Sequence, residues 1–447
     1  MEEKQFSVKI KLPEEVHFII ESLQKQGYEA YAVGGCVRDS ILGREPEDWD
    51  ITTSALPQEV KKVFRKTVDT GIEHGTVTVL LPKKNGDIRP ALCGYEVTTY
   101  RIDGDYEDGR HPQSVSFTRS LTEDLRRRDF TINAMAYSEE AGLVDEFDGL
   151  SDLENGIIRC VGDPDARFDE DALRILRALR FAAQLDFKID GRTEQAICRH
   201  VENLGKVSKE RIQTELSKLL CSARPDRAAD IFRLSMETYI CETFPLVQAG
   251  IFAELRGAAE REETGAGAET EMCSGAMLFS VLPLSQKYLR YAMLCAGMQA
   301  QDTERLLREL KLDNDTIKKA AVLSKHVLRY IPAEKYALKK AMQEMTPELM
   351  RELLLLKKRF CGTVCYQTAC FGEDADALMQ LFEEIIRRDE PVYLADLAVR
   401  GSDLIAAGVA PGPHMGEILQ AMLEDVLHTP VHNSILYLLS QHVAVRR

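Results

Sequence analysis

The chain is 447 residues long, which is more than one ordinary hydrophobic core can organise, so the length predicts two to four domains. No run reaches the ~18 apolar residues of a membrane span. The segment Met1–Phe6 lacks the apolar core of a signal peptide, so we expect a soluble, cytoplasmic protein that does not contact a membrane.

The formal net charge is −15, but an acidic protein can still bind RNA where its basic residues are gathered locally. Two stretches gather them: Arg126–Arg128, and residues 303–360, which hold 14 Lys or Arg against 8 Asp or Glu. For the second stretch, a solvated helix face and an RNA-binding surface are equally compatible with the composition.

The 11 cysteines are scattered without Cys-x-x-Cys spacing, and only Cys361, Cys365 and Cys370 form a cluster. Reduced thiols explain this pattern better than zinc sites or disulfides.

Hydrophobic periodicity predicts alternating helices and strands through the first 100 residues. A helix over 14–26 carries the apolar side chains Val16, Ile19, Ile20 and Leu23 on one side. The further predicted elements, in chain order, are a buried strand over 28–33, a short helix over 36–42, an extended segment over 48–51, a short helix over 57–64, and strands over 76–81 and 95–101.

Two glycines, Gly34 and Gly35, separate the strand over 28–33 from the helix that follows it. A strand that ends in two glycines and opens a helix exposes backbone N–H groups, which predicts a phosphate-binding turn. Arg38, one turn into the helix, adds a cation. Taken alone, a Gly-Gly turn is usually only a turn.

Three carboxylates follow. In an extended segment Asp48 and Asp50 point to one face and repel each other unless a cation lies between them, and Mg²⁺ at a triphosphate is the natural occupant. Glu96, on the strand over 95–101, would supply a third carboxylate from a neighbouring strand, although a glutamate there is equally compatible with a surface position.

The sequence Gly34-Gly35-Cys36-Val37-Arg38-Asp39, followed by Asp48-Trp49-Asp50-Ile51-Thr52-Thr53-Ser54-Ala55, resembles the signature of the nucleotidyltransferase superfamily. It is most similar to the class II branch, which contains the CCA-adding tRNA nucleotidyltransferases and bacterial poly(A) polymerases. The resemblance covers about residues 28–222. It implies an α+β protein with an N-terminal nucleotidyltransferase head containing a small mixed β-sheet, followed by an all-α neck, body and tail.

The same resemblance implies template-independent addition of CCA to tRNA 3′ ends from CTP and ATP, with release of pyrophosphate. Asp48 and Asp50 would hold Mg²⁺, with help from Glu96, and Gly34, Gly35 and Arg38 would hold phosphates. The polar stretch over 103–120 resembles the flexible loop that family members need for the final adenosine.

Residues 125–134 predict the opening of a helix and match the family motif Arg-Arg-Asp-Phe-Thr-Ile-Asn-Ala. The match implies that Arg128 reaches the triphosphate and that Asp129 accepts a hydrogen bond from a ribose hydroxyl. Caps and surface ion pairs are the alternative.

A continuous helix over 168–181 places Asp171 and Arg174 at i and i+3, and the pair resembles the family's Glu-Asp-x-x-Arg motif. Cytosine and adenine both present an amine donor beside a ring-nitrogen acceptor, which a carboxylate beside a guanidinium complements; uracil and guanine do not. Arg177 and Arg180 would then face the triphosphate or the primer. A helix covered with surface ion pairs is the alternative.

We expect four domains: a head over 1–150, a neck over 151–222, a body over 223–310 with an acidic insert near 257–275, and a tRNA-binding tail over 311–447. Residues 145–162 predict a turn, a strand and a second turn, with no strand beyond them, and the helix over 208–220 would support the base-reading helix.

Several alternatives stay open at this point. The chain could be an A-adding enzyme, a poly(A) polymerase or a catalytically inactive RNA-binding protein, and it could be a monomer or a homodimer.

Overall fold

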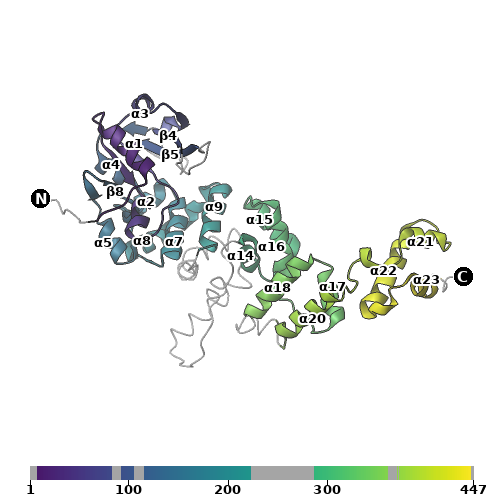
Figure 1. Cartoon of the computed structure of the whole chain (residues 1–447). Coiled ribbons are helices and arrows are strands. Elements are labelled where there is room, and N and C mark those ends of the chain that lie inside the picture. The colour runs from purple at the N-terminus through teal and green to yellow at the C-terminus, as the bar shows by residue number, and fades with distance from the viewer. Residues whose placement is uncertain are drawn as a thin grey trace, which may run out of the picture. The chain divides into compact units, whose positions relative to one another are not determined.

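The computed structural model describes residues 8–82, 92–104, 115–222, 286–360, 370 and 372–443. The chain divides into two compact units, Met1–Glu242 and Thr243–Arg447 (Figure 1). The predicted acidic insert, most of the predicted loop over 103–120, and Cys361 and Cys365 lie outside the described residues. In the part of the chain that is described, no helix has both the length and the apolar character needed to cross a membrane.

The first unit is organised by a seven-stranded mixed sheet with the order β3-β4-β5-β2-β1-β8-β9. Only the β2–β5 pairing is parallel, and the other neighbours pair antiparallel. The strands are β1 (Ala30–Val33), β2 (Ile51–Thr53), β3 (Thr67–Gly71), β4 (Thr76–Pro82), β5 (Leu92–Thr99), β8 (Met135–Ser138) and β9 (Gly142–Asp145). The predicted α+β class with a mixed sheet in the head is confirmed.

The two faces of this sheet differ because side chains alternate along each strand. The helix α3 (Pro57–Val63) packs near β4 and β5, and α1 (Glu14–Gln24) packs near β1 and β2. Val77 and Val79 of β4 and Val97 of β5 are fully buried. Their neighbours in sequence carry hydroxyl or carboxylate groups, such as Thr78 and Glu96, which are paired in register. One face is therefore core and the other is polar, and the polar face carries the candidate site.

The prediction that residues 125–134 open a helix is wrong. The short helix α4 (Leu121–Arg126) ends where the motif begins, and a turn, the 3₁₀ segment η2 (Thr131–Asn133) and β8 follow. The Asp129 carboxylate accepts the backbone N–H of Phe130, and Phe130 forms an antiparallel bridge with Cys160. These contacts take the place of helical hydrogen bonds. Short polar side chains such as Asp often compete with a helix by bonding nearby backbone groups in this way.

The prediction for residues 145–162 missed a helix, α5 (Gly149–Glu154), which precedes the two-residue strand β10 (Ile157–Ile158). The expectation of no later strand is also wrong, because β10 pairs in parallel with β11 (Lys188–Ile189). Strands of two residues are fixed by their partner and leave no periodicity to detect.

The remaining helices of the first unit include α2 (Gly35–Ile41), α6 (Pro164–Glu170), α7 (Leu173–Leu185), α8 (Gly191–His200) and α9 (Lys209–Leu220). The single helix predicted over 168–181 is interrupted, because Asp171 is extended, with φ −147° and ψ 100°. Its carboxylate accepts the backbone N–H of Leu173, the first residue of α7. Aspartate favours such a helix-start position over a helix interior.

The described residues of the second unit are helical. Its α-helices are α14 (Lys287–Leu294), α15 (Ala300–Glu309), α16 (Asn314–Val327), α17 (Lys335–Met342), α18 (Pro347–Phe360), α20 (Ala375–Arg387), α21 (Gly401–Ala406), α22 (Pro413–His428) and α23 (Ile435–His442). The prediction of a mostly helical remainder is confirmed.

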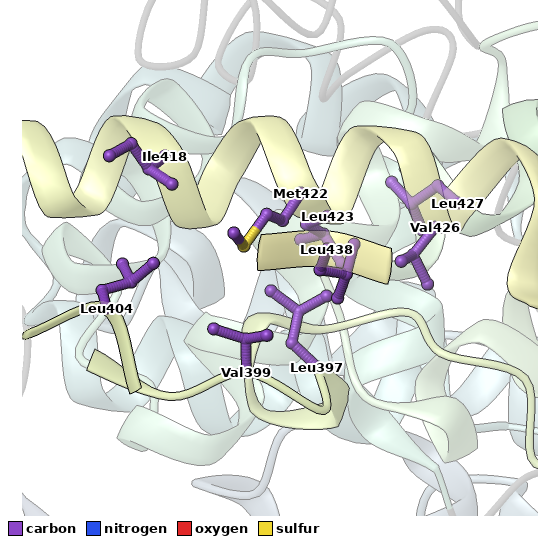
Figure 2. Packing of buried hydrophobic residues seen from close by; sticks show 9 residues of the cluster. All are labelled: Leu397, Val399, Leu404, Ile418, Met422, Leu423, Val426, Leu427 and Leu438. Carbon is purple, nitrogen blue, oxygen red and sulfur yellow. The ribbon is translucent and has the colours of Figure 1, made fainter. Parts of the chain in front are cut away.

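The end of this unit has its own apolar core, which we call the C-terminal cluster. Figure 2 shows how side chains of α22 point toward those of the segment before it and of α23. Its buried members are Leu397, Val399, Leu404, Ile418, Met422, Leu423, Val426, Leu427 and Leu438.

The basic stretch over 303–360 is only partly a cationic surface. Lys339 and Lys357 are fully buried and form ion pairs with Glu390 and Glu373. Some of the local positive charge is therefore structural, while exposed pairs such as Lys358–Asp376 contribute little to stability and separate easily.

Candidate active site

Three carboxylate residues lie near the start of β2 on the polar face of the sheet, close enough for their charges to influence one another. The parallel register pairs Ile51 with Val97, so the preceding residues, Asp50 and Glu96, are aligned as well. The backbone carbonyl of Asp50 accepts the N–H of Val33 at 3.0 Å, which fixes the chain here. Asp48 lies two residues earlier, and all three carboxylate residues are exposed to solvent.

Each of these carboxylates perturbs the others. Restricted hydration raises the pKa of Asp50, and the charge of Asp48 raises it further, while Arg128 opposes the shift. Restricted hydration, together with the charges of Asp50 and Asp48, also raises the pKa of Glu96. Within the described part of the chain, none of the three has an ion pair or a side-chain hydrogen bond. Arg128 compensates the negative charge of this group only in part, because it is also paired with Asp124.

A cation with oxygen ligands fits this group. Among the described residues no three His, Cys, Asp or Glu side chains converge into a ready-made metal cage. Mg²⁺ does not need one, because it keeps several waters and is usually held by one or two carboxylates and by substrate phosphates. The arrangement is suited to an ion that arrives with a triphosphate.

Two arginines and a glycine lie beside the carboxylates. Gly34 has φ +83°, a conformation that favours glycine, and an added Cβ there would lie 3.1 Å from Nη1 of Arg128, so it would also crowd that guanidinium group. Arg128 also contacts Asp124, and its buried Nε has no partner among the described residues. Arg38 lies on the other side, with Nη2 3.7 Å from the position that a Cβ of Gly35 would occupy. Since α2 has only seven residues, these guanidinium groups are the main phosphate-attracting feature.

Arg38 is held rigidly. Its Nε and Nη2 donate to the two oxygens of Asp39 at 2.9 Å each, and Nη1 donates to Oδ1 of Asn133 at 2.7 Å. Three of its five N–H groups are thus used, which leaves two for a ligand.

Asp129 does not point freely toward a ribose. Its Oδ2 accepts Nε and Nη2 of Arg177 at 2.8 and 2.6 Å, and its Oδ1 accepts the N–H of Phe130 and Nδ2 of Asn133. Burial would raise the pKa of Asp129, but Arg177 and Asn133 hold it well below its ordinary value. A ribose hydroxyl would have to share these oxygens.

Asp171 and Arg174 are not bonded to each other, so their predicted i, i+3 pairing is wrong. Arg211 of α9 donates to both Asp171 oxygens, at 3.3 and 2.7 Å. Arg174 donates to Oε2 of Glu170 at 2.6 Å and to the backbone carbonyl of Arg127 at 3.1 Å. The break in the helix at Asp171 explains the change, because it separates the two side chains from a common helical face.

Arg177 and Arg180 form ion pairs within the protein, whereas the sequence predicted that they face the triphosphate or the primer. Arg177 binds Asp129, and Nε of Arg180 donates to Oε2 of Glu215 at 2.5 Å. Both guanidinium groups lie over the ring of Phe181.

Sequence reasoning missed the partners that hold the named residues. They are Asp39, Asp124, Asn133, Glu170, Phe181, Arg211 and Glu215. The available signal was proximity in sequence, because each lies within or beside a motif already singled out. For Arg211 and Glu215, the prediction that 208–220 supports the base-reading helix agrees with the contacts that α9 makes.

Known proteins match this chain along nearly its whole length. A sequence model described as "Poly A polymerase head domain" matches residues 30–159. Models described as "Probable RNA and SrmB- binding site of polymerase A" and as tRNA nucleotidyltransferase domain 2 match residues 186–236 and 284–441. The CCA-adding enzyme of Lactiplantibacillus plantarum is 38% identical over 431 residues, which cover 93% of this chain and 92% of that enzyme. The chain belongs to the family of CCA-adding enzymes.

Other CCA-adding enzymes are also similar to this chain in sequence or in fold. The Geobacillus kaustophilus enzyme is 37% identical over 421 residues, covering 93% of each chain. The structure of the Bacillus stearothermophilus CCA-adding enzyme in complex with CTP has a TM-score of 0.70 at 30% identity and covers 96% of this chain and 98% of its own. The Thermotoga maritima CCA-adding enzyme complexed with tRNA covers 97% of this chain and 95% of its own, with a TM-score of 0.58, and at 22% identity it shows a shared fold alone.

Membership in the CCA-adding family confirms the resemblance seen in Gly34–Asp39 and Asp48–Ala55. Enzymes of this nucleotidyltransferase family generally use divalent metal ions. The oxygen-rich, cation-free group of Asp48, Asp50 and Glu96 fits that requirement.

Proposed function

We propose that this protein adds C, C and A to the 3′ end of tRNA, without a nucleic-acid template, from CTP and ATP. The observation that carries the proposal is the group of three carboxylates, Asp48, Asp50 and Glu96, which Arg128 compensates only in part, on the polar face of a nucleotidyltransferase-type sheet. The relatives named as CCA-adding enzymes, and the B. stearothermophilus enzyme whose structure contains CTP, support the same substrates.

In the reaction, the 3′-hydroxyl of the tRNA attacks the α-phosphate of the nucleotide, and pyrophosphate leaves. Asp48 and Asp50 are the residues that would hold Mg²⁺, which when bound supplies charge neutralisation at the triphosphate and a lower pKa for the attacking hydroxyl. Glu96 accepts a hydrogen bond from that hydroxyl, which would orient it for attack.

Gly34, Gly35, Arg38 and Arg128 bind the triphosphate. Gly34 adopts the positive φ that this turn needs without crowding Arg128, and the Nε of Arg128, which has no partner among the described residues, is a buried donor ready for a phosphate oxygen. The remaining N–H groups of Arg38 provide a second contact.

Asp171 and Arg174 select the base by donor and acceptor pattern. Arg211 and the N–H of Leu173 use three of about four lone-pair positions on the Asp171 carboxylate, which leaves one for the exocyclic amine of cytosine or adenine. Arg174 then donates to the neighbouring ring nitrogen, while uracil and guanine would meet the carboxylate with a carbonyl oxygen.

The second unit, Thr243–Arg447, binds tRNA in this proposal, through the predicted tail over 311–447 and the part of the predicted body over 223–310 that falls within it. The match of residues 284–441 to tRNA nucleotidyltransferase domain 2 supports the assignment. Because tRNA is the proposed substrate, we also propose that the protein acts in the cytoplasm, as a monomer or homodimer.

The test is nucleotide incorporation with Mg²⁺ on tRNA transcripts that end before CCA, after C, and after CC. Addition of C, C and A to the matching primers, with no further extension, is the expected result. Addition of A to the CC-ended primer alone would identify an A-adding enzyme, and long A tails would identify a poly(A) polymerase. Failure to incorporate any nucleotide would favour an inactive RNA-binding protein.

A further inference from the structure

One aromatic ring lies among three arginines at the centre of the first unit. Phe181, on α7, is only 4% exposed. The guanidinium carbons of Arg180, Arg38 and Arg177 lie over its ring at 4.1, 4.9 and 5.4 Å from the ring centroid. Phe130 packs edge-on against the same ring, with centroids 5.8 Å apart and an interplanar angle of 84°.

The three arginines connect different parts of the unit. Arg38 belongs to α2, beside the phosphate-binding glycines, whereas Arg177 and Arg180 belong to α7, which starts beside the base-selecting Asp171. Each has its own carboxylate: Asp39 for Arg38, Asp129 for Arg177 and Glu215 for Arg180. The ring is therefore the element that all three ion pairs share.

A purely apolar residue at position 181 would not attract the three guanidinium groups. Three cations around one point repel one another, and burial, together with Arg177, lowers the pKa of Arg180 against the opposing effect of Glu215. The negative face of an aromatic ring attracts guanidinium groups by about 0.5–2 kcal/mol each, with the larger values at desolvated sites. Leucine would fill much of the volume but offers no such face.

Arg38 depends on the ring in a particular way. Its partners Asp39 and Asn133 come from the head, close to Arg38 itself or to the Asp129 motif. Of the contacts that the structure gives for Arg38, the Phe181 ring is the one that comes from α7. The ring is the direct contact between Arg38 and the base-selecting helix, and it acts beside an indirect connection through Asn133, Asp129 and Arg177.

We propose that Phe181 is a positioning residue that fixes the phosphate-binding Arg38 relative to the helix that follows Asp171 and carries Arg174. The base and the triphosphate of one nucleotide are then held at a constant spacing. The inference rests on the proposed function, and it predicts weaker binding of CTP and ATP alike, with base choice unchanged, when the ring loses its attraction for cations.

The experiment replaces Phe181 in the full chain by phenylalanines that carry one, two or three fluorine atoms. Fluorination changes ring volume little but progressively removes the negative face. We expect the KM for CTP and for ATP to rise stepwise, reaching about three- to tenfold with three fluorines. We expect kcat and the midpoint of thermal unfolding to change little, and UTP and GTP to remain excluded.

The matched control is the same series at Phe168, which is fully buried in α6 and has no cation over its ring in the described part of the chain. Fluorination at Phe168 should leave KM unchanged. A flat KM series at Phe181, an equal rise at Phe168, or a fall in thermal stability without a change in KM would each overturn the proposal.

Direct titration of CTP binding without tRNA separates this inference from the function on which it rests. If wild-type protein adds nothing to any primer, the proposed function fails, yet CTP affinity across the Phe181 series still decides the positioning role. Absence of CTP binding by wild-type protein would overturn both.

Discussion

Two buried regions of this protein differ in composition: the region around Phe181 contains charged side chains, and the C-terminal cluster is apolar. The junction formed by Phe181 and the arginines over its ring buries Arg38 and Arg180 to 8% exposure, and it pairs them with Asp39, the next residue along α2, and with Glu215 of α9. The C-terminal cluster has nine buried apolar residues, and Leu404, Met422 and Leu438 among them are fully buried (Figure 2).

This difference in composition suits different roles: the charged region orients functional side chains, and the apolar cluster stabilises the fold. Buried ion pairs cost so much desolvation that they add little net stability, but they fix side-chain geometry. Apolar burial contributes about 25 cal/mol per Å² without any preferred direction. Changes that leave the ion pairs of the junction in place should therefore alter nucleotide handling more than unfolding, whereas removal of one charged partner costs stability as well. Changes in the cluster should alter unfolding.

The largest expected effect is at the carboxylates that we propose hold the metal. Replacing Asp50 by Ala removes an anionic ligand that no other side chain replaces, and we expect incorporation to fall by about a thousandfold or more, roughly 4 kcal/mol in the barrier. The measurement is the rate of CMP addition to tRNA ending before CCA, over a range of Mg²⁺ concentrations.

Asp69→Asn is the matched control, since Asp69 lies on β3 of the same sheet, where it pairs with Lys61. It should retain wild-type rates. Unchanged incorporation by Asp50→Ala would refute the proposed metal site.

The next effect lies in the C-terminal cluster. Leu438→Ala removes a fully buried side chain, and we expect a loss of about 3–4 kcal/mol in the free energy of unfolding. Urea unfolding of the full chain by circular dichroism measures it, and Trp49, the single tryptophan, reports on the head in the same samples.

Leu436 on the same helix is 86% exposed, so Leu436→Ala should change stability by less than about 0.5 kcal/mol. The folded Leu438→Ala protein should keep the wild-type KM for CTP. A several-fold change in KM would show that the cluster does more than stabilise its unit.

A third effect tests the junction through pH. Asp129 has a folded-state pKa well below its usual range, held there by Arg177 and Asn133 against the opposing effect of burial. A carboxylate of this kind stabilises the fold above its unfolded pKa of about 3.9 and loses that contribution as the pH falls toward the folded value. Asp129→Asn should thus cost about 2 kcal/mol at pH 7, because Arg177 keeps only Glu215 at 3.7 Å.

The cost of Asp129→Asn should shrink as the pH falls below about 4. Unfolding free energies at pH 7, 5 and 3.5 measure it. A cost that stays constant over this range would mean that the ion pair does not stabilise the fold.

Much of the head was predictable from local patterns. The helix over 14–26 and the strands over 28–33, 76–81 and 95–101 correspond to α1, β1, β4 and β5, because the apolar spacing of each segment matches its secondary structure. The meeting of Asp50 with Glu96 followed from strand alternation together with the family resemblance.

The partners of charged residues were not predictable in the same way. Asp171 and Arg174 satisfy the helical i, i+3 spacing, yet Asp171 ends α6 and binds Arg211, 40 residues later. Asp129 lies at a motif that predicted a helix start, yet it binds Arg177 of α7. A guanidinium group pairs with whichever carboxylate the tertiary fold brings close, so the partner cannot be predicted from sequence spacing.

The smallest effect is the most selective one. Asp171→Ala removes the acceptor for the exocyclic amine, and we expect discrimination against UTP and GTP to fall about tenfold, roughly 1.4 kcal/mol, with Mg²⁺ dependence unchanged. Misincorporation of UMP relative to CMP on tRNA ending before CCA measures it. Asp169→Ala, on the exposed side of α6, is the control and should keep wild-type selectivity.

Arg211→Gln sharpens the test, because it leaves the carboxylate of Asp171 in place but removes the group that orients it. It should therefore relax base choice less than Asp171→Ala does. Wild-type fidelity in Asp171→Ala would show that the base is selected elsewhere, and equal relaxation in both variants would show that orientation, rather than the acceptor alone, determines selectivity.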